Sequence, residues 1–265
     1  QFIRTHQPFH WFVEFYGIMR DGGFDVIIGN PPYVEYSKVK KDYTVRGYET
    51  ESCGNLYAFV VEQSLNFSRS GGRWGLISQL SSISTKNMTP LHTFVRNFCS
   101  TLYVSCFAER PQQLFTGACI PLAILIGQKN TTVDKHCSTL TTGVYRWHES
   151  ERETLFQRIQ YCHHTEVVDS SLFYIPKIQS ALELSIYKKF FQHEPISKHR
   201  ILTRSDNSIY YRTAGGRYWK VLLNFSFKNE STANKVTSFD SKLPALVAVS
   251  ILSSSLFWWY YIISF

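Results

Sequence analysis

Charged residues are scarce in this sequence. Asp, Glu, Lys and Arg together make up 18% of its 265 residues, whereas apolar residues make up 44%. A disordered chain shows the opposite balance, with little hydrophobicity and high charge, so disorder is excluded as the main state. The length suffices for one large domain or about one and a half ordinary ones.

The sequence also lacks the cysteine patterns of a disulfide scaffold or a zinc site. None of its six cysteines forms a C-x-x-C pair, and six are few for a secreted scaffold of this length. His136-Cys137 and Cys162-His163-His164 resemble fragments of a metal site but lack its spacing. We therefore expect reduced cysteines, a cytoplasmic location and no metal.

Signals for secretion or membrane insertion are absent too. The most apolar segment, 251–265, is shorter than the roughly 20 residues that a membrane-spanning helix needs. We expect no signal peptide and no membrane partner. The first residue is Gln1 and the last lies within an apolar run, so we expect a piece of a longer polypeptide.

The charge that is present is mostly positive. Lys and Arg number 28 against 20 Asp and Glu, and residues 195–242 alone carry 9 against 3. A basic surface favours an anionic partner such as nucleic acid. Charge alone is equally consistent with an ordinary basic domain. The aromatic content of 16% suits either the stacking of flat ligands or a packed core.

Predicted strands and helices alternate over the first 130 residues. Asn55 is a candidate N-cap for a helix at 56–67, and Gly71 and Gly72 are candidates for its end. Thr89 is a candidate N-cap for a helix at 89–98. This alternation favours a parallel α/β sheet with an antiparallel last pair. The expected strands are 24–29, 74–78, 102–107 and 120–126, and the expected helices are 56–67 and 89–98.

Beyond residue 130 the pattern changes. Threonines at 131–132 and 139–142 indicate a linker, and Gly215-Gly216 indicates a turn. Helices are expected at 151–161, 178–191 and 246–263, the last interrupted by serines at 253–255.

The strongest chemical signal is Asn30-Pro31-Pro32-Tyr33, directly after the first strand. Ligands of open α/β sheets bind at the carboxyl ends of strands. The carbonyls of Asn30 and Pro31 could accept both hydrogens of one amino group, and two prolines restrict the turn. Tyr33 adds a ring that could stack on a base. A turn without chemistry is the structural alternative.

This arrangement suits methyl transfer to a weakly nucleophilic nitrogen. The lone pair of an adenine N6 or a carboxamide nitrogen is delocalised. Two acceptors favour a more pyramidal nitrogen and stabilise the positive charge that develops during attack on a methyl group. A base in duplex DNA must first be flipped out of the helix.

These residues resemble the amino-methyltransferases that modify adenine N6 in DNA, closest to the methyltransferase part of bifunctional type IIG restriction–modification enzymes. The resemblance rests on residues 10–15 (HWFVEF) and 23–33 (GFDVIIGNPPY). It implies catalytic roles for Asn30, Pro31, Pro32 and Tyr33. It also implies S-adenosylmethionine as cofactor, with Glu14 and Phe15 as candidate contacts. For Glu14, a solvated surface carboxylate remains the alternative.

Further segments extend the resemblance over residues 8–127. Residues 54–59 (GNLYAF) resemble motif V of the family, and 71–77 (GGRWGLI) resemble motif VI. Residues 114–117 (LFTG) resemble motif VIII, which implies that Phe115 and Tyr33 enclose the flipped base. Taken one by one, Tyr57, Phe59 and Phe115 are each more typical of core residues than of ligand contacts.

The resemblance implies the second half of a Rossmann-like methyltransferase sheet, followed by an α+β target-recognition region. The expected domains are 1–130 (catalytic, carboxyl-terminal half), 131–194 (helical linker) and 195–265 (incomplete DNA target recognition). The Gly-rich cofactor loop of the family is not found before residue 24, and no P-D…(D/E)-x-K nuclease signature appears. We therefore expect this piece alone to be inactive.

The sequence thus predicts a site-specific, adenine-N6 DNA methyltransferase of a restriction–modification system, with double-stranded DNA as partner. A non-catalytic DNA-binding remnant and a protein glutamine-amide methyltransferase remain as alternatives. The basic, aromatic tail disfavours the latter, since a peptide substrate needs no DNA-recognition region. The candidate DNA contacts are Lys198, Arg200, Arg204, Arg212, Arg217 and Lys220.

Overall fold

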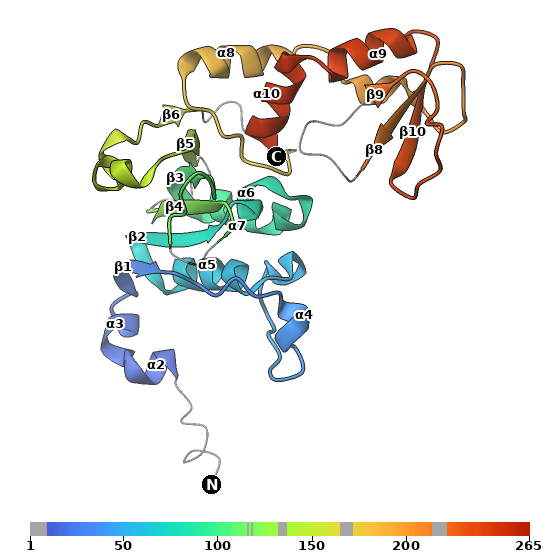
Figure 1. Ribbon diagram of the computed structural model, residues 1–265. Helices are drawn as coiled ribbons and strands as arrows, with labels where there is room; N and C mark the ends of the chain where they lie inside the picture. The colour runs from blue at the N-terminus through green and yellow to red at the C-terminus, as the bar shows by residue number, and fades with distance from the viewer. Residues whose placement is uncertain (1–9, 116, 118, 132–136, 165–171, 214–221) are drawn as a thin grey trace. The chain divides into compact units, whose positions relative to one another are not determined.

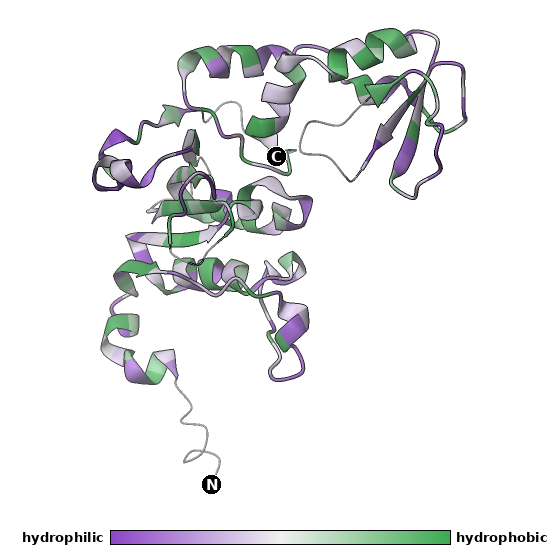
Figure 2. Ribbon diagram, viewed as in Figure 1, coloured by the Kyte–Doolittle hydropathy of each residue, from purple (hydrophilic) through white to green (hydrophobic). Residues whose placement is uncertain are grey.

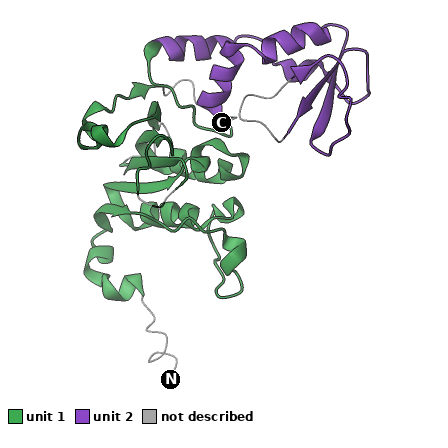
Figure 3. Ribbon diagram, in the orientation of Figure 1, with its two compact units in different colours: residues 1–181, 265 green, residues 182–264 purple. Residues whose placement is uncertain are grey.

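The computed structural model describes residues 10–115, 117, 119–131, 137–164, 172–213 and 222–265. The chain forms two compact units (Figure 3). The first comprises Gln1–Ala181 with Phe265, and the second comprises Leu182–Ser264. Each unit has a sheet of its own.

A mixed six-stranded sheet forms the centre of the first unit (Figure 1), with strand order β1-β2-β4-β3-β5-β6. β1 runs parallel to β2, and β3 runs parallel to β5, whereas β4 is antiparallel to both β2 and β3. The α/β class and the antiparallel pair are therefore confirmed. The strands are β1 Phe24–Gly29, β2 Ser68–Gln79, β3 Cys99–Phe107, β4 Leu122–Lys129, β5 Ser138–Tyr145 and β6 Cys162–His163.

Two longer helices pack against this sheet. The first, α5, follows Asn55, whose Oδ1 accepts a hydrogen bond from the Tyr57 N–H at 3.4 Å, as its N-cap role predicts. Its buried residues join Trp74 and Leu76 in the main core. The helices are α2 Trp11–Glu14, α3 Tyr16–Arg20, α4 Tyr36–Val39, α5 Leu56–Phe67, α6 Ser81–Ser84 and α7 Thr89–Phe98. Short 3₁₀ turns span Glu51–Cys53, Lys86–Met88, Glu149–Thr154 and Phe156–Arg158.

Several sequence expectations for the first unit are wrong in detail. Helix α5 ends at Phe67, and Gly71 and Gly72 lie within β2. Thr89 is the first residue of α7 and its hydroxyl donates to the Lys86 carbonyl at 2.7 Å, so it is not the N-cap. Residues 149–158 form 3₁₀ turns in place of an α-helix.

The threonines at 139–142 form β5 and not a linker. Thr139, Thr141 and Thr142 are buried, and β-branched residues fit the half-buried surface of a sheet. The compact unit consequently extends through Ala181, past the expected boundary at residue 130. The assignment of functions to the ranges 1–130, 131–194 and 195–265 stays a prediction.

Two glycines are required by close packing. In the β2–β4 register Trp74 lies opposite Gly127, where a Cβ would come within 2.5 Å of the indole ring. At Gly23, which has a φ of +117°, a Cβ would lie 2.3 Å from the Phe67 carbonyl oxygen. Gly23 therefore allows the chain to enter β1 directly beside the end of α5.

The second unit combines an antiparallel sheet with helices, as expected for an α+β region. The strand order is β7-β10-β8-β9. Ile209 and Phe239 form a core with residues of α9, which is largely hydrophobic (Figure 2). The elements are α8 Ala181–Phe190, a 3₁₀ turn Ile196–His199, β7 Arg200–Ile201, β8 Ser208–Arg212, β9 Leu222–Leu223, β10 Asn234–Phe239, α9 Ala245–Leu252 and α10 Ser255–Ser264. The break between α9 and α10 confirms the predicted interruption, and the turn expected at Gly215-Gly216 lies outside the described residues.

Among the described residues, no single helix is long and apolar enough to cross a membrane, although α9 and α10, bent by 60°, pass that test of length and composition as a pair. None of the six cysteines forms a disulfide bond. No three His, Cys, Asp or Glu side chains within the described ranges could hold a metal ion together. The cytoplasmic location stays a prediction.

Candidate active site

The tetrapeptide lies where the sequence placed it, at the carboxyl end of β1. Asn30 is exposed, Pro31 is buried and Tyr33 is half-buried. The Tyr33 hydroxyl donates a hydrogen bond to Asn30 Oδ1 at 2.9 Å. Burial raises the pKa of Tyr33, which keeps its hydroxyl protonated and able to donate at neutral pH.

The carbonyl of Pro31 is available as a second acceptor. No hydrogen bond reaches it from any residue in the part of the chain that the structure describes. Asn30 Oδ1 accepts one bond from Tyr33, and a carbonyl oxygen has two lone pairs. The turn therefore carries two acceptors, each with a lone pair that no described residue occupies.

Backbone hydrogen bonds attach the chain after Tyr33 to the start of α5. The Leu56 N–H donates to the Val34 carbonyl at 3.0 Å, and the Tyr36 N–H donates to the Gly54 carbonyl at 2.9 Å. Glu35 and Asn55 form an isolated β-bridge. The chain that follows the tetrapeptide is thus held beside the segment that resembles motif V.

A buried carboxylate fixes the following loop. Glu62 of α5 is 3% exposed and accepts hydrogen bonds from the Thr50 N–H at 2.9 Å, the Thr50 hydroxyl at 2.7 Å and the Glu49 N–H at 3.1 Å. A buried charge is tolerated only when its lone pairs are satisfied in this way. The loop at 34–53 is therefore tied to the helix beside the tetrapeptide.

A cavity of about 620 Å³ runs along β1 and α5 and reaches the tetrapeptide. Gly29, Asn30, Pro31 and Pro32 line one part of it. The rest is largely apolar and aromatic, with Trp11, Phe24, Phe59 and Phe67 among its walls and Gln63 among its polar groups. A pocket of this size and character suits a small molecule with a flat ring.

Neither of the candidate cofactor residues lines this cavity. Glu14 is exposed at the end of α2. The Phe15 ring stacks on Trp11 with centroids 5.5 Å apart and meets Phe24 edge-on at 5.2 Å. Phe15 therefore supports two rings that do line the cavity. Trp11 and Phe24 belong to the segments that carry the resemblance, but no pattern in the sequence assigned either of them to a site.

The second base-stacking candidate, Phe115, lies in the loop between β3 and β4 and is 37% exposed. No ring contact joins it to Tyr33 among the described residues. The two are connected indirectly, because Tyr33 packs against a buried cluster that contains Leu114, the neighbour of Phe115. Enclosure of a base between the two rings stays a prediction.

The basic candidates of the second unit are spread over several elements. Lys198 pairs with Glu194 at 2.7 Å, Arg200 begins β7, and Arg212 ends β8 with an exposed side chain. Arg204 donates a hydrogen bond to the Tyr210 hydroxyl at 2.8 Å. Arg217 and Lys220 lie outside the described residues. Contact of this set with DNA stays a prediction.

Comparison with known proteins gives a consistent picture. Residues 1–115 match the family model described as Eco57I restriction-modification methylase. A Methanocaldococcus jannaschii protein named as a putative type II restriction enzyme and methyltransferase is 36% identical over 58 residues, which cover 22% of this chain and 5% of that protein. The chain thus spans a small part of the curated relative that it matches.

Solved structures show partial likenesses. A DrdV–DNA complex matches with a TM-score of 0.43 and 15% identity, covering 57% of this chain and 18% of the other. A nuclease-deletion mutant of the Type ISP restriction-modification enzyme LlaGI, bound to a DNA substrate mimic, matches with a TM-score of 0.42 and 14% identity. The match covers 57% of this chain and 18% of the other.

The tetrapeptide after β1 and the adjoining helix lie within the matched part of the sequence. The resemblance to restriction–modification methyltransferases is thereby confirmed, since residues 1–115 of this chain match the Eco57I restriction-modification methylase model.

Proposed function

We propose that this chain is part of an adenine-N6 DNA methyltransferase that uses S-adenosylmethionine. The observation that carries the proposal is the pair of acceptors at the end of β1, Asn30 Oδ1 and the Pro31 carbonyl. A pair of acceptors on a rigid turn fits the two hydrogens of one amino group. Polarisation of that group stabilises the charge that develops on nitrogen in the transition state.

The residues around the cavity fit the cofactor. Aromatic rings such as Trp11 and Phe24 offer faces to a flat base, and the Gln63 amide offers a donor and an acceptor. When bound, S-adenosylmethionine supplies an electrophilic methyl group. The residues of the chain orient the amino group toward it, with Asn30 and Pro31 as acceptors and Tyr33 against the base.

DNA as the substrate is supported by charge. The second unit carries 11 Lys and Arg against 5 Asp and Glu between residues 182 and 264. A basic region after the catalytic half would bind phosphates and position a flipped adenine at Asn30.

The test is the substitution Asn30→Ala, which removes one of the two acceptors. The relative matched above is much longer than this chain. We would therefore measure single-turnover methyl transfer to duplex DNA with the longest natural polypeptide that contains residues 1–265. The rate should fall about 10²–10³-fold, as after loss of one preorganised group elsewhere. Affinity for S-adenosylmethionine should fall less than the rate, because the proposal assigns Asn30 Oδ1 to the amino group of the base, although Asn30 also lines the cavity.

The matched control is Asn66→Ala, which removes an exposed amide from α5 outside the cavity lining. Its rate should equal that of the unmodified protein. An unchanged rate in Asn30→Ala would show that the tetrapeptide is a structural turn and would remove the main support for the proposed function.

A further inference from the structure

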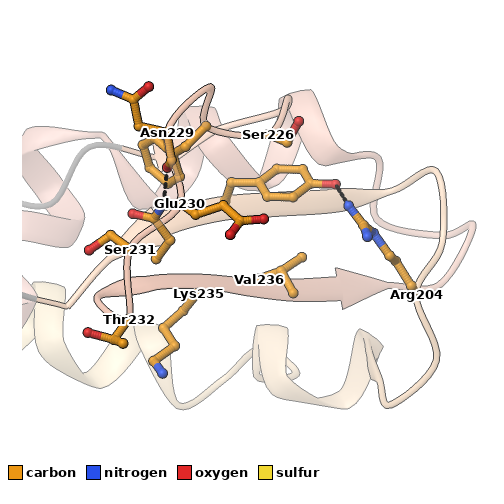
Figure 4. Close-up of a pocket in the computed structure, with 11 residues that line it drawn as sticks. Arg204, Ser226, Asn229, Glu230, Ser231, Thr232, Lys235 and Val236 are labelled. Carbon is orange, nitrogen blue, oxygen red and sulfur yellow. Dashed lines mark hydrogen bonds between the residues drawn. The ribbon is translucent and has the colours of Figure 1, made fainter.

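The second unit has a pocket of about 640 Å³ that no methyl-transfer role uses (Figure 4). Its position follows from the β8–β10 register, in which Tyr210 lies opposite Val236 and Ile209 lies opposite Thr237. Ile209 belongs to the core that contains Ala248 of α9. Because side chains alternate along a strand, Tyr210 and Val236 face the other side of the sheet. They form an apolar part of the pocket wall, and Val236 is 46% exposed.

Arg204 is held at this pocket by Tyr210. Its Nη2 donates to the Tyr210 hydroxyl at 2.8 Å, and its guanidinium carbon lies 5.7 Å from the centre of the ring. One hydrogen bond leaves most of the five guanidinium N–H donors unused. Lys235 of β10 is among the lining residues, but its side chain leaves the opposite face of the strand from Val236 (Figure 4).

Glu230 gives the pocket its specific character. In Figure 4 its carboxylate points into the space that Arg204 and Val236 border. No hydrogen bond or ion pair joins that carboxylate to another described residue. The loop around it is ordered by Asn234, whose Nδ2 donates to the Asn229 carbonyl at 2.8 Å and whose N–H donates to the Ser231 carbonyl at 3.0 Å.

A carboxylate and a guanidinium in one pocket select among ligands. Glu230 repels a phosphate placed beside it, so a site for phosphate alone is disfavoured. An ionised carboxylate only accepts hydrogen bonds, and in DNA the base donors that suit it are exocyclic amino groups. A base edge with an amino group, next to a backbone phosphate, satisfies both Glu230 and Arg204.

We propose that this pocket reads one amino-bearing base of the DNA target. Glu230 accepts a hydrogen bond from the exocyclic amino group of cytosine or adenine, while Arg204 binds a neighbouring phosphate. This inference rests on the proposed function, because it takes DNA as the partner. It assigns sequence discrimination to Glu230 and affinity to Arg204.

The experiment selects bound sequences from a pool of randomised duplexes with the longest natural polypeptide that contains residues 1–265. The unmodified chain should prefer cytosine or adenine at one position. Glu230→Ala should relax that preference about tenfold or more, the discrimination typical of a good base contact. Arg204→Gln should weaken binding to all sequences and leave the preference unchanged. The matched control is Asp206→Ala, which removes an exposed carboxylate of the same unit that does not line the pocket.

The outcomes separate this inference from the proposed function. If Glu230→Ala binds DNA with the preferences of the unmodified chain, or if both Glu230→Ala and Asp206→Ala change them alike, the inference is wrong and DNA binding stands. Binding by the unmodified chain without any preference for an amino-bearing base also overturns the inference. If the unmodified chain binds no duplex even at low salt, DNA as its partner is wrong as well.

Discussion

The hydroxyl of Tyr33 donates a hydrogen bond to Asn30 Oδ1, the oxygen that we assign to the reacting amino group. The bond joins two residues that are three positions apart, and it fixes the orientation of the Asn30 amide before a base binds. A carbonyl oxygen can accept two hydrogen bonds, so Tyr33 and the incoming amino group can share it. Tyr33 thus has two separable roles, a ring that stacks and a hydroxyl that orients.

Substitutions of Tyr33 separate these roles. Tyr33→Ala removes the ring and should weaken base binding by the ~1–3 kcal/mol that stacking contributes per base. Tyr33→Phe keeps the ring and loses only the bond to Asn30, so most activity should remain. Single-turnover methylation compares the two variants. Equal losses of methylation rate in Tyr33→Ala and Tyr33→Phe would contradict a stacking role for the ring.

Binding of DNA by the second unit should depend strongly on salt. The log–log slope of affinity against salt should be near −0.9 for each phosphate contact among the basic candidates. Arg212→Gln should reduce the slope more than Lys198→Gln, because Lys198 is already paired with Glu194. Fluorescence anisotropy with a duplex measures both slopes. An affinity that stays flat between low and physiological salt would exclude phosphate contacts.

Acid should destabilise the first unit through His92. Burial lowers the pKa of His92 to about 4. Its Nε2 lies 2.6 Å from the Ser82 carbonyl oxygen and donates a hydrogen bond to it, because a carbonyl oxygen can only accept. The unfolded chain therefore binds more protons than the folded chain between about pH 6.5 and 4. Stability should be full above that window and should fall by up to about 3 kcal/mol as the pH drops through it.

The measurement is the urea midpoint as a function of pH. His92→Gln keeps a donor for Ser82 but cannot be protonated, so its profile should be flatter between pH 6.5 and 4. His193→Gln, at an exposed position, is the control and should follow the unmodified chain. A His92→Gln profile as steep as that of the control would contradict this assignment.

Lys177 should destabilise the folded state at neutral pH. It is 2% exposed, its Nζ has no hydrogen-bond partner among the described residues, and burial lowers its pKa to about 8. The unfolded chain binds more protons than the folded chain between about pH 8 and 10.4, so stability should rise as the pH increases across that window. Lys177→Met should therefore stabilise the protein at pH 7 by up to about 3 kcal/mol, and much less at pH 10.

Denaturant unfolding at the two pH values tests this expectation. The control is Lys41→Met, at an exposed position, which should change stability little at either pH. A Lys177→Met variant that is less stable than the unmodified chain at pH 7 would show that the ammonium has favourable partners in solution.

The sequence by itself determined the features that depend on local interactions. The apolar run of β1, the two prolines after it and the capping of α5 by Asn55 all act within a few residues, so their pattern predicts both the strand and the turn with its acceptors. The break between α9 and α10 was likewise visible as a run of serines.

Only the tertiary structure decided the features that join distant segments. The threonines of β5 form a strand because β3 and β6 pair with them, although their composition alone is typical of a linker. Trp11 and Phe67 are far apart in the chain, and their ring centroids meet at 5.2 Å beside the cavity. Glu62 reaches back to Thr50, and Arg204 reaches Tyr210. Such contacts depend on how elements pack against one another, and packing brings together residues whose separation in sequence carries no signal of it.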